Sequence, residues 1–140
     1  MSKPHLKSVE VRLKVPFHDL DPARIVWHGN YLKYFDIARF ALFKEAGIDL
    51  YETALKGEYA FPVTKTYTKH IAPLIYGDEF ICKATVVEAR IKITINFEIR
   101  RIKDGVVCAR GRGDQVAIKM PEREMLLEIP PEVAHALGCE

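Results

Sequence analysis

The sequence is poor in cysteine and has no long apolar run. Its three cysteines, Cys82, Cys108 and Cys139, form no CxxC pair, so we expect reduced thiols and no disulfide framework. Because no 18 consecutive residues are apolar, no transmembrane helix is expected. The N-terminus also lacks the apolar core and small-residue cleavage site of a secretory signal. These absences predict a cytoplasmic protein without a membrane span.

The sequence also lacks a strong excess of charge. Its 21 basic and 19 acidic side chains give a net charge of +2 at pH 7, which is too small for the basic footprint of a nucleic-acid binder. The composition, 49% hydrophobic and 29% charged over 140 residues, is that of an ordinary globular protein. We therefore expect one domain, spanning residues 1–140, that binds no nucleic acid.

Hydrophobic periodicity predicts the secondary structure. Apolar residues at every second position indicate strands at 9–15, 61–69, 80–86 and 91–99 and a strand from Val106, which follows an Asp104-Gly105 signal for a type I′ hairpin. Apolar residues at three- and four-residue steps indicate a long helix from 31 to 46, with Asn30 as its N-cap. Shorter helices are expected after Asp49 and after Pro130.

The order of these elements is one strand, one long helix and then four successive strands. Parallel doubly wound folds need strands and helices to alternate, so we predict an α+β protein with an antiparallel sheet packed on one main helix. Pro62, near the start of the strand at 61–69, favours either an edge position or an irregular entry for that strand. One helix leaves apolar surface on such a sheet, which favours pairing with a second copy of the chain.

Titratable side chains gather between the first strand and the long helix, in the segment 17–30. The segment contains two carboxylates, two imidazoles and an arginine just before a helix N-terminus, where backbone N–H groups stabilise an anion. A carboxylate placed there can act as a nucleophile or a general base. The same pattern also fits a polar connecting loop whose aspartates make local turn hydrogen bonds.

Residues 17–31, FHDLDPARIVWHGNY, resemble the signature of the 4-hydroxybenzoyl-CoA thioesterase family, with its Asp-x-Asp, apolar triplet and Asn-Tyr. Residues 73–78, PLIYGD, are similar to a turn between two sheet strands in that family. The resemblance implies a hot-dog fold, in which an antiparallel sheet wraps around one long central helix. It also implies hydrolysis of a small or medium acyl-CoA, aliphatic or aromatic, at sites formed between the subunits of a homodimer or homotetramer.

The resemblance assigns roles to individual residues. Asp21 matches the catalytic carboxylate, either as nucleophile or as general base. His28 matches the position whose backbone N–H points at the thioester carbonyl, and its ring is a second candidate for an acid or orienting group. Arg90 and Lys92 resemble the region that holds the nucleotide of coenzyme A. The family commonly has glycine where this sequence has Arg24, which implies either a changed direction for Asp21 or a cation beside the site.

Other residues of the segment have weaker claims. Asp19 is expected to cap a turn or position its neighbour, and Tyr34, Phe35 and Phe61 are expected either to line the acyl pocket or to pack in the core. The spacing of His18, Asp19, Asp21 and His28 matches no closed zinc pattern, so no metal is expected. Coenzyme A is part of the substrate and no separate cofactor is implied. The alternatives are a non-enzymatic acyl-CoA binding protein and a hot-dog hydratase or dehydratase.

Overall fold

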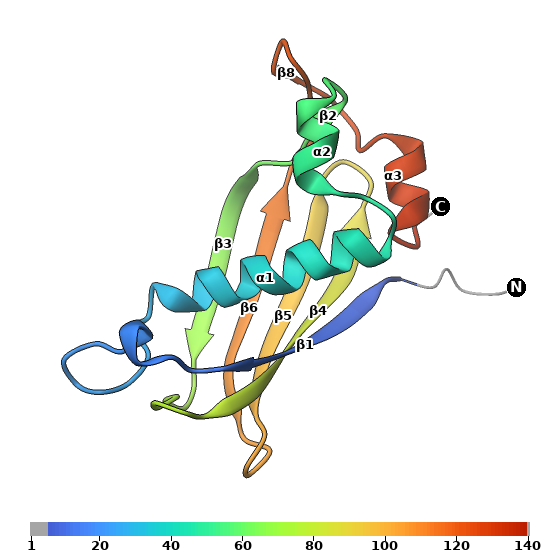
Figure 1. Cartoon of the computed structure of the whole chain (residues 1–140). Coiled ribbons are helices and arrows are strands. Elements are labelled where there is room, and N and C mark those ends of the chain that lie inside the picture. Colours follow the sequence, from blue (N-terminus) through green and yellow to red (C-terminus); the bar gives the residue numbers. More distant parts are fainter. Residues whose placement is uncertain (1–5, 140) are drawn as a thin grey trace, which may run out of the picture.

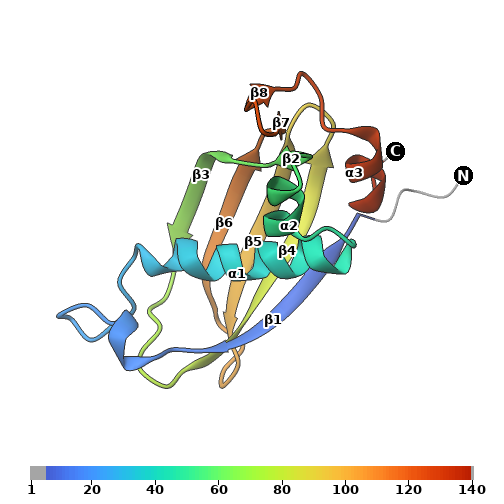
Figure 2. The same ribbon diagram turned by 45° about the horizontal axis from the view of Figure 1, so that its top comes forward.

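A long helix lies across one face of a curved antiparallel sheet in the computed structural model, which describes residues 6–139 (Figure 1). The helix is α1 (Asn30–Glu45), and the five-stranded sheet has the strand order β1-β4-β5-β6-β3. Figure 2 shows the same layers from a second direction, with β1 running beneath the helix. The predicted α+β architecture is confirmed.

The predicted order of the main elements is also confirmed. The strands of the large sheet are β1 (Ser8–Lys14), β3 (Val63–His70), β4 (Glu79–Ala89), β5 (Ile93–Arg101) and β6 (Val107–Gln115). The shorter elements are η1 (Phe17–Asp19), α2 (Leu50–Leu55), β2 (Tyr59–Ala60), β7 (Ile118–Lys119), β8 (Glu124–Met125) and α3 (Pro131–Ala136). β2, β7 and β8 form a small second sheet, which the sequence did not predict because two-residue strands show no periodicity.

The core lies between α1 and the sheet. The buried side of the helix presents Tyr34, Phe35, Ala38 and other apolar side chains to the inner face of β4, β5 and β6. Phe35 stacks on Phe97 of β5 with ring centroids 4.6 Å apart. Gly111 of β6 makes this approach possible, because a Cβ at that position would collide with the Phe35 ring. Close packing of aromatic rings on a glycine therefore fixes the distance between helix and sheet.

Two local predictions were wrong. The N-cap of α1 is Gly29, not Asn30, and the Asn30 amide donates to the Asp19 carbonyl oxygen over 2.9 Å. The hairpin between β5 and β6 is not a type I′ turn, since Gly105 has positive φ but Asp104 does not. A type I′ turn needs positive φ at both central residues.

Pro62 has the expected effect, because β3 begins directly after it and forms one edge of the large sheet. The predicted cap of α2 is confirmed too, with the Asp49 carboxylate accepting hydrogen bonds from the N–H groups of Tyr51 and Glu52.

The three cysteines are free, and burial raises the pKa of Cys82 to about 12. Within residues 6–139, no helix is long and apolar enough to cross a membrane.

Candidate active site

Asp19 fastens the segment between β1 and α1 to the start of the helix. Its side chain is 3% exposed, and its two carboxylate oxygens accept from Lys33 Nζ over 2.5 Å and from the Tyr34 hydroxyl over 2.7 Å. Its carbonyl oxygen accepts from the Trp27 N–H and the Asn30 amide, each over 2.9 Å. Four hydrogen bonds from the end of the loop and the start of α1 thus converge on one residue, which identifies Asp19 as a positioning residue.

The electrostatics of this cluster keep Asp19 ionised. Burial raises the pKa of Asp19, but the hydrogen bonds from Lys33 and Tyr34 and the positive charge of Lys33 outweigh burial and bring that pKa below its ordinary value. Burial and the neighbouring Asp19 carboxylate raise the pKa of Tyr34. The hydroxyl of Tyr34 therefore remains a donor, and the carboxylate of Asp19 is occupied by its partners.

Asp21 sits in a tight turn that leaves part of its carboxylate free. The Asp21 N–H donates to the Ile25 carbonyl oxygen over 2.8 Å, and its own carbonyl accepts from the Arg24 N–H over 2.9 Å. Oδ1 accepts from the Ala23 N–H over 2.8 Å, while Oδ2 has no hydrogen-bond partner among residues 6–139. Asp21 is half-buried, so this oxygen is available to a bound molecule.

Arg24 adopts the backbone conformation expected of the glycine that it replaces. Its φ is 66°, which lies in the left-handed region. A residue with a side chain adopts this region only at a cost in free energy. The turn that holds Asp21 therefore has the positive φ that glycine permits, although arginine occupies the position. Of the two consequences considered for Arg24, the structure shows the cation beside the site, because Arg24 and Asp21 line the same pocket.

Free backbone donors lie next to Asp21 at the N-terminus of α1. In the described part of the chain, neither the His28 nor the Gly29 N–H donates a hydrogen bond. The ring of Trp27 lies directly against Gly29, where any Cβ would collide with it. Two unpaired N–H groups at the start of a 16-residue helix form an arrangement that stabilises a developing negative charge.

The first pocket at Asp21, which we call the histidine pocket, has a volume of about 410 Å³. It is lined by Asp21, His28 and His70 and by the less polar side chains Ile25, Val26, Tyr31, Ile71, Ala72 and Pro73. The His70 ring lies 4.8 Å from that of Tyr31 and 6.5 Å from that of His28, measured between centroids. The sequence does not single out His70 as a site residue, because no local signal shows that the end of β3 meets the helix N-terminus.

The second pocket, which we call the arginine pocket, has a volume of about 820 Å³. Its polar lining residues are His18, Asp21 and Arg24, and the others are Phe17, Leu20, Pro22, Ile75 and Tyr76. Asp21 lines both pockets. A molecule that reacts at Asp21 can therefore place one part in each of them.

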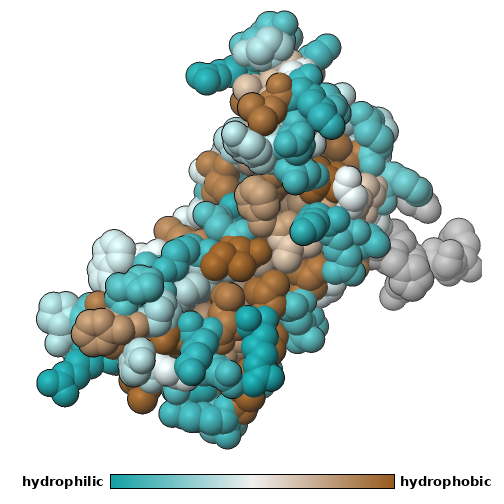
Figure 3. Space-filling view, in the orientation of Figure 1, coloured by the Kyte–Doolittle hydropathy of each residue, from teal (hydrophilic) through white to brown (hydrophobic). Residues whose placement is uncertain are grey.

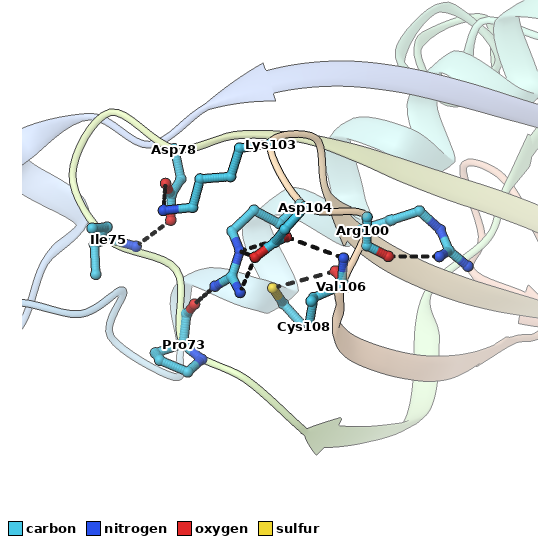
Figure 4. A network of polar contacts seen from close by, with 10 residues as sticks. Pro73, Ile75, Asp78, Arg100, Lys103, Asp104, Val106 and Cys108 are labelled. Carbon is cyan, nitrogen blue, oxygen red and sulfur yellow. Dashed lines mark hydrogen bonds and ion pairs between the residues drawn. The ribbon is translucent and has the colours of Figure 1, made fainter.

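A polar network fixes the turn at 73–78, which contributes to the walls of both pockets (Figure 4). The Asp78 carboxylate accepts from the Ile75 N–H over 3.0 Å and pairs with Lys103 Nζ at 3.2 Å. Arg101 donates to the Pro73 carbonyl oxygen over 2.7 Å. The end of β5 and the β5–β6 hairpin thus hold the turn at 73–78 in place.

Arg90 and Lys92 lie at the far end of the sheet. They follow β4, whose 11 residues span roughly 35 Å, whereas Asp21 lines pockets with residues of the turn at 73–78, which precedes that strand. Lys92 Nζ pairs with the Asp114 carboxylate at 3.2 Å, and Arg90 lines a separate pocket of about 610 Å³ beside α3. One chain does not bring these residues to Asp21, so their role in binding coenzyme A stays a prediction.

The aromatic residues considered for the acyl pocket are core residues. Tyr34, Phe35 and Phe61 are buried and line neither the histidine pocket nor the arginine pocket. Tyr34 serves Asp19, and Phe35 packs on Phe97. The acyl-pocket alternative for these three residues is therefore not what the structure shows.

Comparison with known proteins places this site in a family. The family model of the thioesterase-like superfamily matches residues 15–137. The 4-hydroxybenzoyl-CoA thioesterase of Pseudomonas sp. is 24% identical over 133 residues, which cover 90% of this chain and 94% of that protein. The crystal structure of a 1,4-dihydroxy-2-naphthoyl-CoA thioesterase from Synechocystis is 21% identical, has a TM-score of 0.84, and matches over 93% of this chain and 95% of its own.

A crystal structure of a 4-hydroxybenzoyl-CoA thioesterase mutant in complex with 4-hydroxybenzoyl-CoA has the same TM-score of 0.84. It is 20% identical, and the match covers 94% of this chain and 99% of that one. These structural matches confirm the hot-dog fold. The family match extends over the loop with Asp21, the long helix and four of the five strands of the large sheet, and the chain belongs to the thioesterase-like superfamily.

Proposed function

We propose that this protein hydrolyses the thioester of a small or medium acyl-CoA, aliphatic or aromatic, at Asp21. Family membership and the acyl-CoA thioesterases among its relatives support thioester hydrolysis. The observation that carries the assignment to Asp21 is its position between two pockets, with one carboxylate oxygen unpartnered in the described residues. An ionised carboxylate in that position is a nucleophile or a base.

Two routes use this carboxylate, and both give the free acid and coenzyme A. In one, Asp21 attacks the thioester carbonyl, the C–S bond breaks with release of the thiolate, and water then hydrolyses the mixed anhydride. In the other, Asp21 takes a proton from a water molecule that attacks the same carbon, the C–S bond then breaks, and the leaving thiolate takes up a proton. The His28 N–H at the start of α1 is placed to hold the oxyanion in either route, a contribution of about two to three orders of magnitude in rate per donor.

The active unit is a homodimer or homotetramer with sites between subunits. β3 is an edge strand whose residues are exposed or half-buried, and it carries His70 into the histidine pocket. An unpaired edge is a template for another strand. The outer side of α1 exposes Leu32, Ile37 and Phe40, and Figure 3 shows apolar surface over the middle of the helix.

A second copy also offers a way to supply the basic residues that one chain keeps distant from its own Asp21. Arg90 and Lys92 of one subunit would then serve the substrate at Asp21 of another. Sedimentation equilibrium tests the assembly, and a mass equal to one chain at all concentrations would contradict it.

The free cysteines fit a reducing compartment, and we place the protein in the cytoplasm. Hydrolysis at Asp21 needs water and no separate cofactor.

The experiment measures release of free thiol from a panel of aliphatic and aromatic acyl-CoAs. Asp21→Asn keeps the shape and the Oδ1 acceptor but removes the charge, so kcat should fall by about two orders of magnitude or more. Asp49→Asn is the matched control, because Asp49 also accepts from backbone N–H groups through Oδ1 but caps α2 outside the site. Its turnover should equal that of the wild type.

Each other outcome selects an alternative. Equal turnover in Asp21→Asn and wild type would remove Asp21 from the mechanism. No release from any thioester, with acyl-CoA still raising the melting temperature, would favour a binding protein. Hydration of crotonyl-CoA without thiol release would favour the hydratase.

A further inference from the structure

The arginine pocket contains a cation with no partner in the protein. Among residues 6–139, the Arg24 guanidinium makes no hydrogen bond and no ion pair, not even with Asp21. The other carboxylate nearby, that of Asp19, is occupied by Lys33 and Tyr34. A charged group with five donors and no acceptor within the chain is free to bind an anion from outside.

The backbone of Arg24 is held in one conformation at the edge of this pocket. Arg24 is held at φ 66° by hydrogen bonds of the Asp21 turn, with Arg24 N–H donating to the Asp21 carbonyl oxygen over 2.9 Å. The left-handed conformation is unfavourable for arginine and favourable for glycine. A strained residue beside a reactive group indicates that its side chain has a use there.

The rest of the pocket suits an organic molecule. Phe17 and Tyr76 meet edge to face with ring centroids 6.2 Å apart, and their side chains are 76% and 63% exposed. Large aromatic surfaces beside an open cavity bind apolar groups. The pocket therefore combines an apolar wall with one unpaired cation, next to the carboxylate at which the thioester reacts.

We propose that the arginine pocket holds an anionic oxygen group of the substrate against the Arg24 guanidinium, either a carboxylate on the acyl group or a phosphate of coenzyme A. The inference rests on the proposed function, because the thioester must lie at Asp21. Since Asp21 lines both pockets, the anion-bearing part of the substrate extends into the arginine pocket and the other part into the histidine pocket. Arg24 is thus a specificity-determining residue.

Four thioesters distinguish the two sources of the anion. Glutaryl and hexanoyl groups, one with a terminal carboxylate and one without, are each joined to coenzyme A and to N-acetylcysteamine, which has no phosphate. The variants are Arg24→Gly, Arg24→Lys and Arg123→Gly. Arg123 is the matched control, because it also has positive φ, 61°, and lies in the β7–β8 turn outside both pockets.

Arg24→Gly should lower kcat/KM for the anion-bearing thioesters by at least about tenfold relative to hexanoyl-N-acetylcysteamine, the loss expected for one charged hydrogen bond. A loss for both glutaryl thioesters identifies the acyl carboxylate, and a loss for both coenzyme A thioesters identifies the phosphate. Arg24→Lys should retain most of the preference, since it keeps the charge. The same ratios in Arg24→Gly as in Arg123→Gly would overturn the proposal.

A binding readout separates this proposal from the proposed function. If no thioester is hydrolysed by the wild type, hydrolysis is wrong, but the stabilisation of the same proteins by the same four thioesters still tests the pocket. A shift in melting temperature that is lost for anionic thioesters in Arg24→Gly alone supports the anion site. Equal shifts in Arg24→Gly and Arg123→Gly contradict it.

Discussion

Asp19 and Asp21 are two residues apart, yet the structure gives them opposite environments. Asp19 is 3% exposed, and both of its carboxylate oxygens are hydrogen-bonded to side chains of α1. Asp21 is half-buried, and its one occupied oxygen accepts only from its own turn. The part of the loop around Asp19, its inner half, is therefore anchored to the helix. The part around Asp21 and Arg24, its outer half, is available for chemistry.

This difference shows how an Asp-x-Asp pair divides its work. A buried carboxylate with a lysine and a tyrosine hydroxyl gains stability from its charge, but both of its oxygens are engaged and a substrate cannot reach them. A carboxylate in an open turn contributes little to stability but can meet a substrate. The anchored aspartate fixes the position from which the second one acts.

The largest expected effect on folding is that of Asp19→Asn. The substitution keeps the shape but removes the charge that Lys33 and Tyr34 hold, so the free energy of unfolding should fall by about 2 kcal/mol. Asp21→Asn, which retains the Oδ1 acceptor, should change it by less than about 0.5 kcal/mol. Urea unfolding of both variants measures the contrast, and equal losses would abolish the distinction between the two halves.

Acid should weaken the same anchor. Because the pKa of Asp19 is lowered in the folded protein, its contribution to stability is fully present above the unfolded value, about 4, and is lost as pH falls through the lower folded value. The wild type should therefore lose stability more steeply below pH 4 than Asp19→Asn, in which this titration is absent. Parallel pH profiles of unfolding for the two proteins would contradict the lowered pKa.

Tyr34→Phe should have a smaller effect, about 1 kcal/mol. It removes one donor to Asp19 but leaves Lys33 and the backbone contacts of the loop in place. Thermal unfolding measures the loss, with Tyr67→Phe as the control, since Tyr67 is 61% exposed on β3. A loss in Tyr34→Phe no greater than in the control would show that Lys33 alone anchors Asp19.

The fold was predictable because the hydrophobic periodicity of each main element is visible in the local sequence. The alternation from Ile91 to Ile99 and the helical spacing from Tyr31 to Ala46 depend on near neighbours only. Both elements form, although β5 begins at Ile93 and not at Ile91. The cap of α1 was not predictable in the same way. Asn30 is a good capping residue, but its amide is drawn to the Asp19 carbonyl, a contact that depends on tertiary structure.

The site residues in the loop before α1 were predictable from the sequence, but those that other elements contribute were not. The loop motif located Asp21 and His28, and the structure places both at one pocket. His70 and the turn at Pro73 reach that pocket through strand pairing of β3 with β6 and through the Arg101 hydrogen bond, and neither relation is visible in local sequence. The same applies to Arg90, whose distance from Asp21 follows from the length and direction of β4.

The smallest expected effect on stability is that of substituting Arg24, in the outer half of the loop. Arg24→Gly removes the strain at φ 66° but makes the unfolded chain more flexible, so the net gain in the free energy of unfolding should be about 0.5–1 kcal/mol. Gly47→Ala is the reverse test: Gly47 has φ 84° and open space around its Cβ position, so the variant should lose about 1 kcal/mol through strain alone. Chemical denaturation of both measures the pair, and a loss of stability in Arg24→Gly would mean that Arg24 holds the fold. A gain in stability together with a loss of anion preference would show that the outer half gives up stability for binding, whereas the carboxylate of Asp19 stabilises the loop that positions Asp21.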